Sequence, residues 1–133
     1  MDKKIIDEDI SVSGQIRPDD ILGLKTAGVK SIICNRPDNE DPGQINYQLI
    51  EQAALDEGLE FRFLPVVSGQ VSLKDAIAFD ELTDGLPKPI HAYCRSGTRS
   101  TTLWALAALK KGMDKNQILQ KASQAGYDLS QSI

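Results

Sequence analysis

The chain has 133 residues, a formal net charge of −4, two cysteines and one histidine. This length suffices for one domain with its own core, so we expect a single domain over residues 1–133 that needs no disulfides. The acidic charge and the lack of a basic run argue against nucleic acid as a partner. So few histidines and cysteines predict neither a metal nor a cofactor.

The first nine residues place acids among apolar side chains, a pattern unlike a signal peptide or a membrane-spanning segment. We therefore expect a cytoplasmic protein that does not bind membranes. The sequence predicts no particular oligomeric state.

Short apolar runs alternate with helix-like segments along the whole chain, a rhythm typical of α/β domains. The expected strands are residues 10–13, 29–34, 61–64 and 90–93. The expected helices are residues 17–28, 45–58, 72–84, 100–111 and 115–125. Together they predict a central, mainly parallel sheet flanked by helices.

Residues 94–100 join the last expected strand to the helix of residues 100–111. A strand that turns into a helix directs several unpaired backbone N–H groups at one point, and such a loop binds oxyanions. Gly97 allows the backbone angles that the loop needs, and Arg99 offers a planar fork for two oxygens. The same groups stabilise a negative sulfur, so we expect Cys94 to be a nucleophilic thiolate.

The other residues of this loop have supporting roles in the same hypothesis. Ser100 is expected to donate a hydrogen bond to the sulfur and so help a covalent adduct to leave. The remaining loop residues are expected to bind the anion, and they are Arg95, Ser96, Gly97 and Thr98.

Two further segments follow strands at the same expected edge of the sheet, residues 34–41 and 65–70, where ligands of α/β proteins bind. The acids of the first segment are candidates for a general acid, or simply form a solvated loop, and they are Asp38, Glu40 and Asp41. Arg36 either binds a second part of an anionic substrate or pairs with these acids.

Several motifs, in this order, resemble the beta-lactamase hydrolase-like phosphatase family, which is related to the dual-specificity and tyrosine phosphatases. The motifs are Ser13-Gly14-Gln15, residues 32–40, Ala53-Ala54 with Gly58-Leu59, Leu64-Pro65-Val66 and residues 92–100. The resemblance implies a cysteine-dependent phosphatase fold. In it Cys94 attacks phosphorus, Arg99 and loop amides hold the phosphoryl oxygens, and water hydrolyses the phosphocysteine.

The chain departs from the tyrosine phosphatase pattern in its loop. Four residues separate Cys94 from Arg99, where those phosphatases have five, and Tyr93 replaces a histidine. The shorter loop resembles that of the rhodanese sulfurtransferases, which carry a persulfide on their cysteine.

The aspartate that such phosphatases carry after the Pro-Val segment is also absent, and residues 67–69 stand in its place. Leaving-group protonation must then come from Asp38, Glu40, Asp41 or Asp75, or be missing. We therefore expect slow turnover of unactivated phosphoesters.

Cys34 ends a strand that we expect beside the Cys94 strand. It is either a buried strand residue or a redox partner that traps oxidised Cys94 or accepts its sulfur. Three functions remain open at this point: a phosphatase acting on a phosphorylated substrate, a sulfurtransferase, and a module that binds an anionic or phosphorylated partner without turnover.

Overall fold

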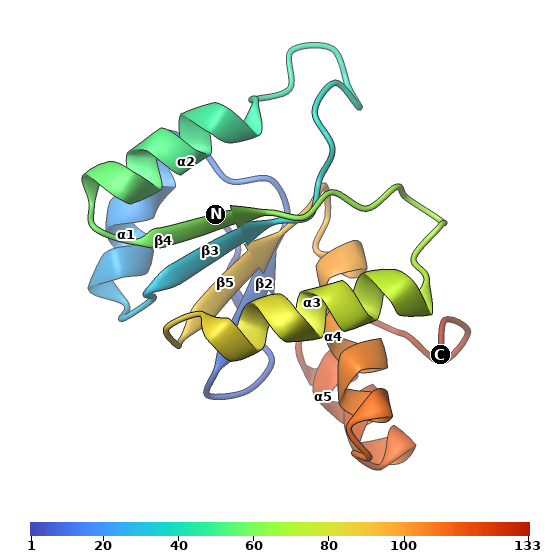
Figure 1. Ribbon diagram of the computed structural model, residues 1–133. Coiled ribbons are helices and arrows are strands. Elements are labelled where there is room, and N and C mark those ends of the chain that lie inside the picture. Colours follow the sequence, from blue (N-terminus) through green and yellow to red (C-terminus); the bar gives the residue numbers. More distant parts are fainter.

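A five-stranded sheet forms the centre of the computed structural model, which describes residues 1–133 (Figure 1). Its strands lie in the order β1-β2-β5-β3-β4. Their bounds are β1 Lys4–Ile5, β2 Ile10–Ser13, β3 Ser31–Cys34, β4 Glu60–Phe63 and β5 Ile90–Tyr93. The pairs β2·β5, β5·β3 and β3·β4 are parallel, and only β1 runs antiparallel to its neighbour. The expected mainly parallel α/β sheet is confirmed.

Helices cover both faces of this sheet (Figure 1). They are the short 3₁₀ helix η1 Pro18–Asp20, then α1 Ile21–Thr26, α2 Tyr47–Asp56, α3 Leu73–Gly85, α4 Thr98–Lys110 and α5 Lys115–Gln124. The first two α-helices pack on one face and the last three on the other, each with its own core cluster. No helix combines the length and apolar character needed to cross a membrane.

The central strands β5 and β3 are fully buried and mostly apolar because both of their faces are covered. Helix α4 is correspondingly buried along most of its length, with nine buried residues. Its Ala-rich sequence lets it pack closely on the sheet. The parallel strands end at one edge, and α4 begins at that edge, directly after Gly97. The predicted loop of residues 94–99 therefore lies where the carboxyl ends of β2, β5 and β3 converge.

Two details differ from the expected elements. The pair β1·β2 is held by backbone pairing over two residues, too short for a side-chain pattern to predict. The helix expected from Arg17 begins instead as the 3₁₀ turn η1, because the Arg17 backbone N–H donates to Asp20 Oδ2 at 2.8 Å and tightens the first turn.

Candidate active site

Cys94 lies directly after β5, at the centre of the loop. Its side chain is fully buried, and its Sγ accepts a hydrogen bond from the Gly97 backbone N–H at 3.1 Å. The Cys94 N–H donates to Ser13 O at 3.3 Å, which continues the β2·β5 pairing into the loop. The sulfur thus contacts a backbone N–H of the loop, as the anion-loop hypothesis requires.

Gly14, which follows β2, lies close to the backbone of the loop. The next residue, Gln15, donates its backbone N–H to Arg95 O at 3.3 Å. A Cβ at Gly14 would come within 2.8 Å of the same carbonyl oxygen. Only glycine therefore allows the end of β2 to approach the loop this closely.

Gly97 is covered from outside by Tyr127, a residue of the C-terminal segment. Gly97 has φ of 96°, and a Cβ there would overlap the Tyr127 hydroxyl. That hydroxyl donates to Ser96 O at 3.0 Å. Burial, followed by the nearby Cys94 sulfur, raises the pKa of Tyr127. Tyr127 thus fixes the peptide whose N–H contacts the sulfur.

Arg99 is buried and held in place by two partners. Its Nη1 donates to Glu40 Oε2 at 2.6 Å and to Val66 O at 2.9 Å, and its Nη2 donates to Glu40 Oε1 at 2.9 Å. Glu40 and, to a smaller extent, the Cys94 sulfur raise the pKa of the Arg99 guanidinium. Glu40 and Val66 do not engage the Nε–H and the second Nη2 proton, so these groups remain for the Cys94 sulfur and for an anion.

Glu40 serves as the partner of two arginines and does not suit the role of a general acid. Besides Arg99, its Oε1 accepts from Arg36 Nε at 3.0 Å. The Arg99 hydrogen bond, with a further contribution from Arg36, lowers the pKa of Glu40. A carboxylate held ionised in this way has no proton to donate at neutral pH, so these contacts favour a role in orienting Arg99 over the expected acid role.

Arg36 pairs with acids and does not face a substrate. It is buried, and its other two nitrogens donate to Gln15 Oε1 at 3.0 Å and to Asp41 Oδ2 at 2.7 Å. Asp41 Oδ2 also lies 3.1 Å from Arg95 Nε. The first of the two expected roles for Arg36, substrate binding, is thus corrected, and the second, pairing with the acids, is observed.

Three other expected roles are replaced by structural ones. Asp38 Oδ1 accepts from the Tyr47 N–H at 2.9 Å and so caps α2, and Asp75 forms a capping box with Ser72 at the start of α3. Ser100 Oγ donates to Asn35 Oδ1 at 2.8 Å, so its proton is directed to the end of β3 and away from the Cys94 sulfur. None of these side chains is free for proton transfer in this conformation.

Cys34 lies in the core cluster beneath α1 and α2, together with Tyr93. Its thiol donates to Arg36 O at 3.3 Å, and burial raises its pKa to about 11. Both cysteines are free. Because side chains alternate along β5, Cys94 is directed away from the face that Tyr93 and Cys34 share. The structure therefore favours the buried strand residue over the redox partner.

A cavity of about 620 Å³ opens beside the loop, and we call it the loop cavity. Its lining residues are Ser68, Gly69, Val71, Arg95, Ser96, Thr98, Arg99, Thr102 and Ser132. The lining contains two arginines and no acid, whereas every other cavity of this acidic protein includes at least one carboxylate. Cys94 itself does not line the cavity, but four residues of its loop do.

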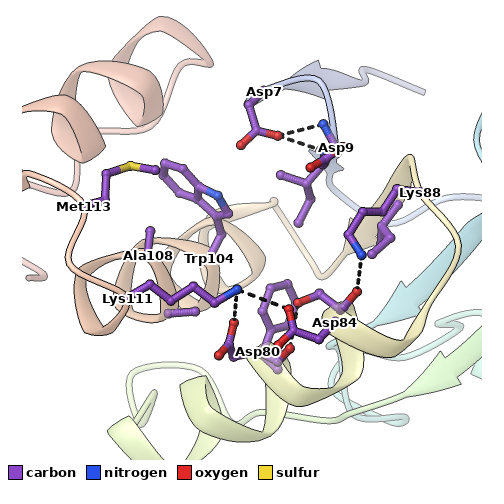
Figure 2. Close-up of a pocket in the computed structure, with 14 residues that line it drawn as sticks. Asp7, Asp9, Asp80, Asp84, Lys88, Trp104, Ala108, Lys111 and Met113 are labelled. Atoms are coloured by element: carbon purple, nitrogen blue, oxygen red, sulfur yellow. Dashed lines mark hydrogen bonds and ion pairs between the residues drawn. The ribbon is translucent and has the colours of Figure 1, made fainter.

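A second cavity, of about 320 Å³, lies at the opposite edge of the sheet beside Ile10 and Ile90 (Figure 2). Trp104 lies at its wall, and Lys111 pairs with Asp80 at 2.7 Å and with Asp84 at 3.2 Å. None of the site residues expected from the sequence reaches this cavity. The chemistry therefore concentrates at the loop cavity.

Comparison with known proteins identifies the family of this chain. Residues 2–110 match the family described as beta-lactamase hydrolase-like protein, phosphatase-like domain. The chain belongs to this family. A beta-lactamase hydrolase-like protein of Xylella fastidiosa (strain Temecula1) is 32% identical over 133 residues, which are 98% of this chain and 31% of that protein. The chain thus spans about a third of the length of that relative.

Two solved structures with the same fold as this chain are informative. The crystal structure of a candidate phosphatase from Neisseria meningitidis Z2491 superposes with a TM-score of 0.89 at 32% identity, covering 98% of this chain and 93% of the other. P. aeruginosa TpbA in complex with phosphotyrosine has a TM-score of 0.71 at 14% identity, covering 97% and 76%. The fold is that of the cysteine phosphatases.

Sequence reasoning missed two contributors to the site of this beta-lactamase hydrolase-like phosphatase domain. Tyr127 and Ser132 follow the part of the chain that matches the family, and neither belongs to a motif. They reach the loop only because α5 packs back on α4. A tyrosine near the end of an outer helix carries no local signal of such a contact.

Proposed function

We propose that this chain is a cysteine-dependent phosphatase-like hydrolase in which Cys94 forms a phosphocysteine intermediate. The observation that carries the proposal is the arrangement of Cys94 and Arg99 beside the one cavity whose charged lining residues are all arginines. The sulfur contacts a loop amide, and Glu40 fixes Arg99 with part of its guanidinium directed to the sulfur. Such donors bind the oxygens of a phosphoryl group and stabilise charge that develops on them.

The reaction proceeds in two displacements. The Cys94 thiolate attacks phosphorus in line with the ester oxygen, so the S–P bond forms as the P–O bond breaks and the leaving group departs with the electron pair. Water then attacks phosphorus, the S–P bond breaks, and inorganic phosphate and the thiolate are released. Because Cys94 is fully buried, the loop side chains have to move aside before the sulfur meets the substrate.

Protonation of the leaving group is the weak part of this mechanism. No carboxyl group lines the loop cavity, and the four acids considered from the sequence either pair with arginines or cap helices. General acid catalysis is typically worth about 10²–10⁴ in rate. We therefore expect measurable turnover of an activated ester such as p-nitrophenyl phosphate and far slower turnover of alkyl phosphates.

The test compares the wild type with Cys94→Ser on p-nitrophenyl phosphate, with release of p-nitrophenol measured. Wild-type turnover that Cys94→Ser abolishes supports the proposal, and the matched change Cys34→Ser should leave turnover intact. A trapped phosphocysteine at Cys94, seen by mass spectrometry after an acid quench, gives direct support. Turnover that persists in Cys94→Ser contradicts the proposal.

A second candidate function is sulfur transfer, and the loop length favours it. With four residues between Cys94 and Arg99, the loop is compact, and a sulfane sulfur needs less space beside the buried Cys94 sulfur than a phosphoryl group does. Incubation with thiosulfate and then cyanide tests this candidate. A Cys94 persulfide and thiocyanate release without hydrolysis of the aryl phosphate identify a sulfurtransferase, whereas anion binding without either reaction identifies a non-catalytic module.

A further inference from the structure

We propose that the substrate is a small, hydroxyl-rich molecule that carries a second anionic group beside the phosphoryl group that is transferred. This inference rests on the proposed phosphatase function and specifies the substrate of the same site. It rejects a phosphorylated aromatic side chain as the preferred substrate.

The composition of the loop cavity does not favour an aromatic substrate. Of its nine lining residues only Val71 is hydrophobic, and none is aromatic. A phenyl ring bound there would lie against hydroxyl groups and lose its hydration without gaining apolar contact. Hydroxyl groups of a substrate, by contrast, find partners among Ser68, Ser96, Thr98, Thr102 and Ser132.

Arg95 provides the place for a second anionic group. Its side chain is 65% exposed, and its one ion pair runs from Nε to Asp41. Both of its terminal nitrogens are without a protein partner and can form the bidentate pair that arginine makes with phosphate or carboxylate. Arg99 lines the same cavity but is fixed toward Glu40 and the sulfur, so the two arginines divide the binding of two anionic groups between them.

The size and charge of the loop cavity agree with this division. Its volume of about 620 Å³ lies within the range of small-molecule sites and exceeds what one phosphoryl group needs. The two arginines of its lining and Arg36 pair with two acids, Glu40 and Asp41, so this cluster of three arginines and two acids has a net charge of +1 in a chain of net charge −4. A polyanion is therefore attracted to this cavity and repelled by most of the remaining surface.

The experiment compares the inhibition constants of fructose 1,6-bisphosphate, fructose 6-phosphate and phosphotyrosine against hydrolysis of p-nitrophenyl phosphate, because binding does not depend on the leaving group. We expect the bisphosphate to bind about 10- to 100-fold more tightly than both others, as a charge-assisted hydrogen-bond pair provides. Arg95→Gln should bring the ratio of bisphosphate to monophosphate close to one. The matched change Arg62→Gln, at an exposed arginine of β4 paired with Glu60, should leave the ratio unchanged. A preference for phosphotyrosine, or a ratio that Arg95→Gln does not alter, overturns the inference.

Hydrolysis of p-nitrophenyl phosphate in the same series separates the two proposals. If the wild type hydrolyses it and Cys94→Ser does not, equal affinity for the three phosphates contradicts only the proposed substrate class. If the wild type hydrolyses nothing, the phosphatase proposal fails, and calorimetric binding of the same sugar phosphates to wild type and Arg95→Gln decides the anion pair. Equal affinity for mono- and bisphosphate then overturns it.

Discussion

Glu40 binds two arginines, and its two carboxylate oxygens make different contacts. Oε2 receives the shortest contact to Arg99, at 2.6 Å, while Oε1 is shared between Arg99 and Arg36. The carboxylate is only 21% exposed, so a change there is felt by both guanidinium groups. Under the proposed function, a residue that holds Arg99 in place affects catalysis without touching the substrate.

Glu40→Gln therefore tests whether Glu40 positions Arg99 or donates a proton to the leaving group. The amide keeps the shape but not the charge, and we expect kcat/KM to fall by about 10-fold or more because Arg99 is no longer held in one orientation. As a positioning residue, Glu40 should affect p-nitrophenyl phosphate and poorer leaving groups equally. A loss confined to poor leaving groups would restore the general acid role. Glu81→Gln, an exposed acid of α3, is the control.

His91 is the chain's one histidine, and it is buried between two serines of the neighbouring strand. Its Nδ1 and Nε2 each lie 2.8 Å from a hydroxyl, of Ser11 and Ser13 respectively. Burial, with a smaller contribution from the charge of Lys3, lowers its pKa from 6.5 to about 3. The folded protein thus keeps the imidazole neutral, whereas the unfolded chain protonates it near its usual pKa.

The free energy of unfolding should consequently fall as the pH is lowered below 6.5. Between the two pKa values the unfolded state binds one more proton at this site, so stability rises with pH, by up to about 1.4 kcal/mol per pH unit. Urea unfolding between about pH 5 and 6.5, where carboxylates titrate little, measures the slope. It should flatten in His91→Gln. In the folded wild type, the single imidazole NMR signal should not titrate in this range, and a titration near pH 6.5 would refute the assignment.

The loop of residues 94–99 depends on a contact between two distant elements. Helix α4 starts at Thr98, after a left-handed Gly97, and the C-terminal segment after α5 places Tyr127 against that glycine. Gly112 has the same φ of 96° but nothing within 4 Å of its would-be Cβ. Gly112 is therefore a control that separates the effect of backbone strain from that of the clash with Tyr127.

Gly97→Ala and Gly112→Ala should add similar backbone strain but differ in their effect on activity. Each places alanine in the left-handed region, at a cost of about 1–2 kcal/mol in the free energy of unfolding. Only Gly97→Ala also displaces Tyr127 and shifts the amide that contacts Cys94, so we expect it alone to lower kcat by about 100-fold. Adding Tyr127→Ala should recover part of that loss. Equal activity in the two single variants would show that the contact is unimportant.

The elements themselves were largely predictable because local patterns determine them. Four of the five strands and all of the main helices follow apolar periodicity and glycine stops. The loop was predictable for the same reason, since a strand, a glycine and a helix are contiguous there. The contacts around it were not, because Arg99 and Glu40 are 59 residues apart and no pattern in either segment encodes their pairing.

At the scale of the whole molecule, the last 23 residues complete both the core and the site. Ile118, Ala122, Ala125 and Leu129 belong to the cluster between the sheet and helices α3 to α5. Ser132 lines the loop cavity, and Tyr127 covers the loop. The net charge of −4 did not predict that arginines gather at the loop cavity. Net charge sums over the whole chain and carries no information about position.

Ending the chain at Lys110 should therefore unfold it. The truncation exposes the apolar surface of α4, and burial of each large side chain is worth about 1.5–3 kcal/mol against a total stability of about 5–15 kcal/mol. Circular dichroism and thermal melting measure the outcome. Leu129→Ala, a fully buried residue of this segment, should fold but lose about 2–5 kcal/mol in the free energy of unfolding. A truncated chain with the wild-type Tm would contradict this dependence.

A thiol with no exposed surface, set behind arginines, should select its chemical modifiers by charge. Iodoacetate carries a carboxylate and enters by the route an anion takes, so it should alkylate Cys94 faster than the uncharged iodoacetamide. Cys34, whose pKa of about 11 keeps it protonated, should stay unlabelled by both reagents. Peptide mapping would then find a single carboxymethyl group, and excess inorganic phosphate would slow its incorporation.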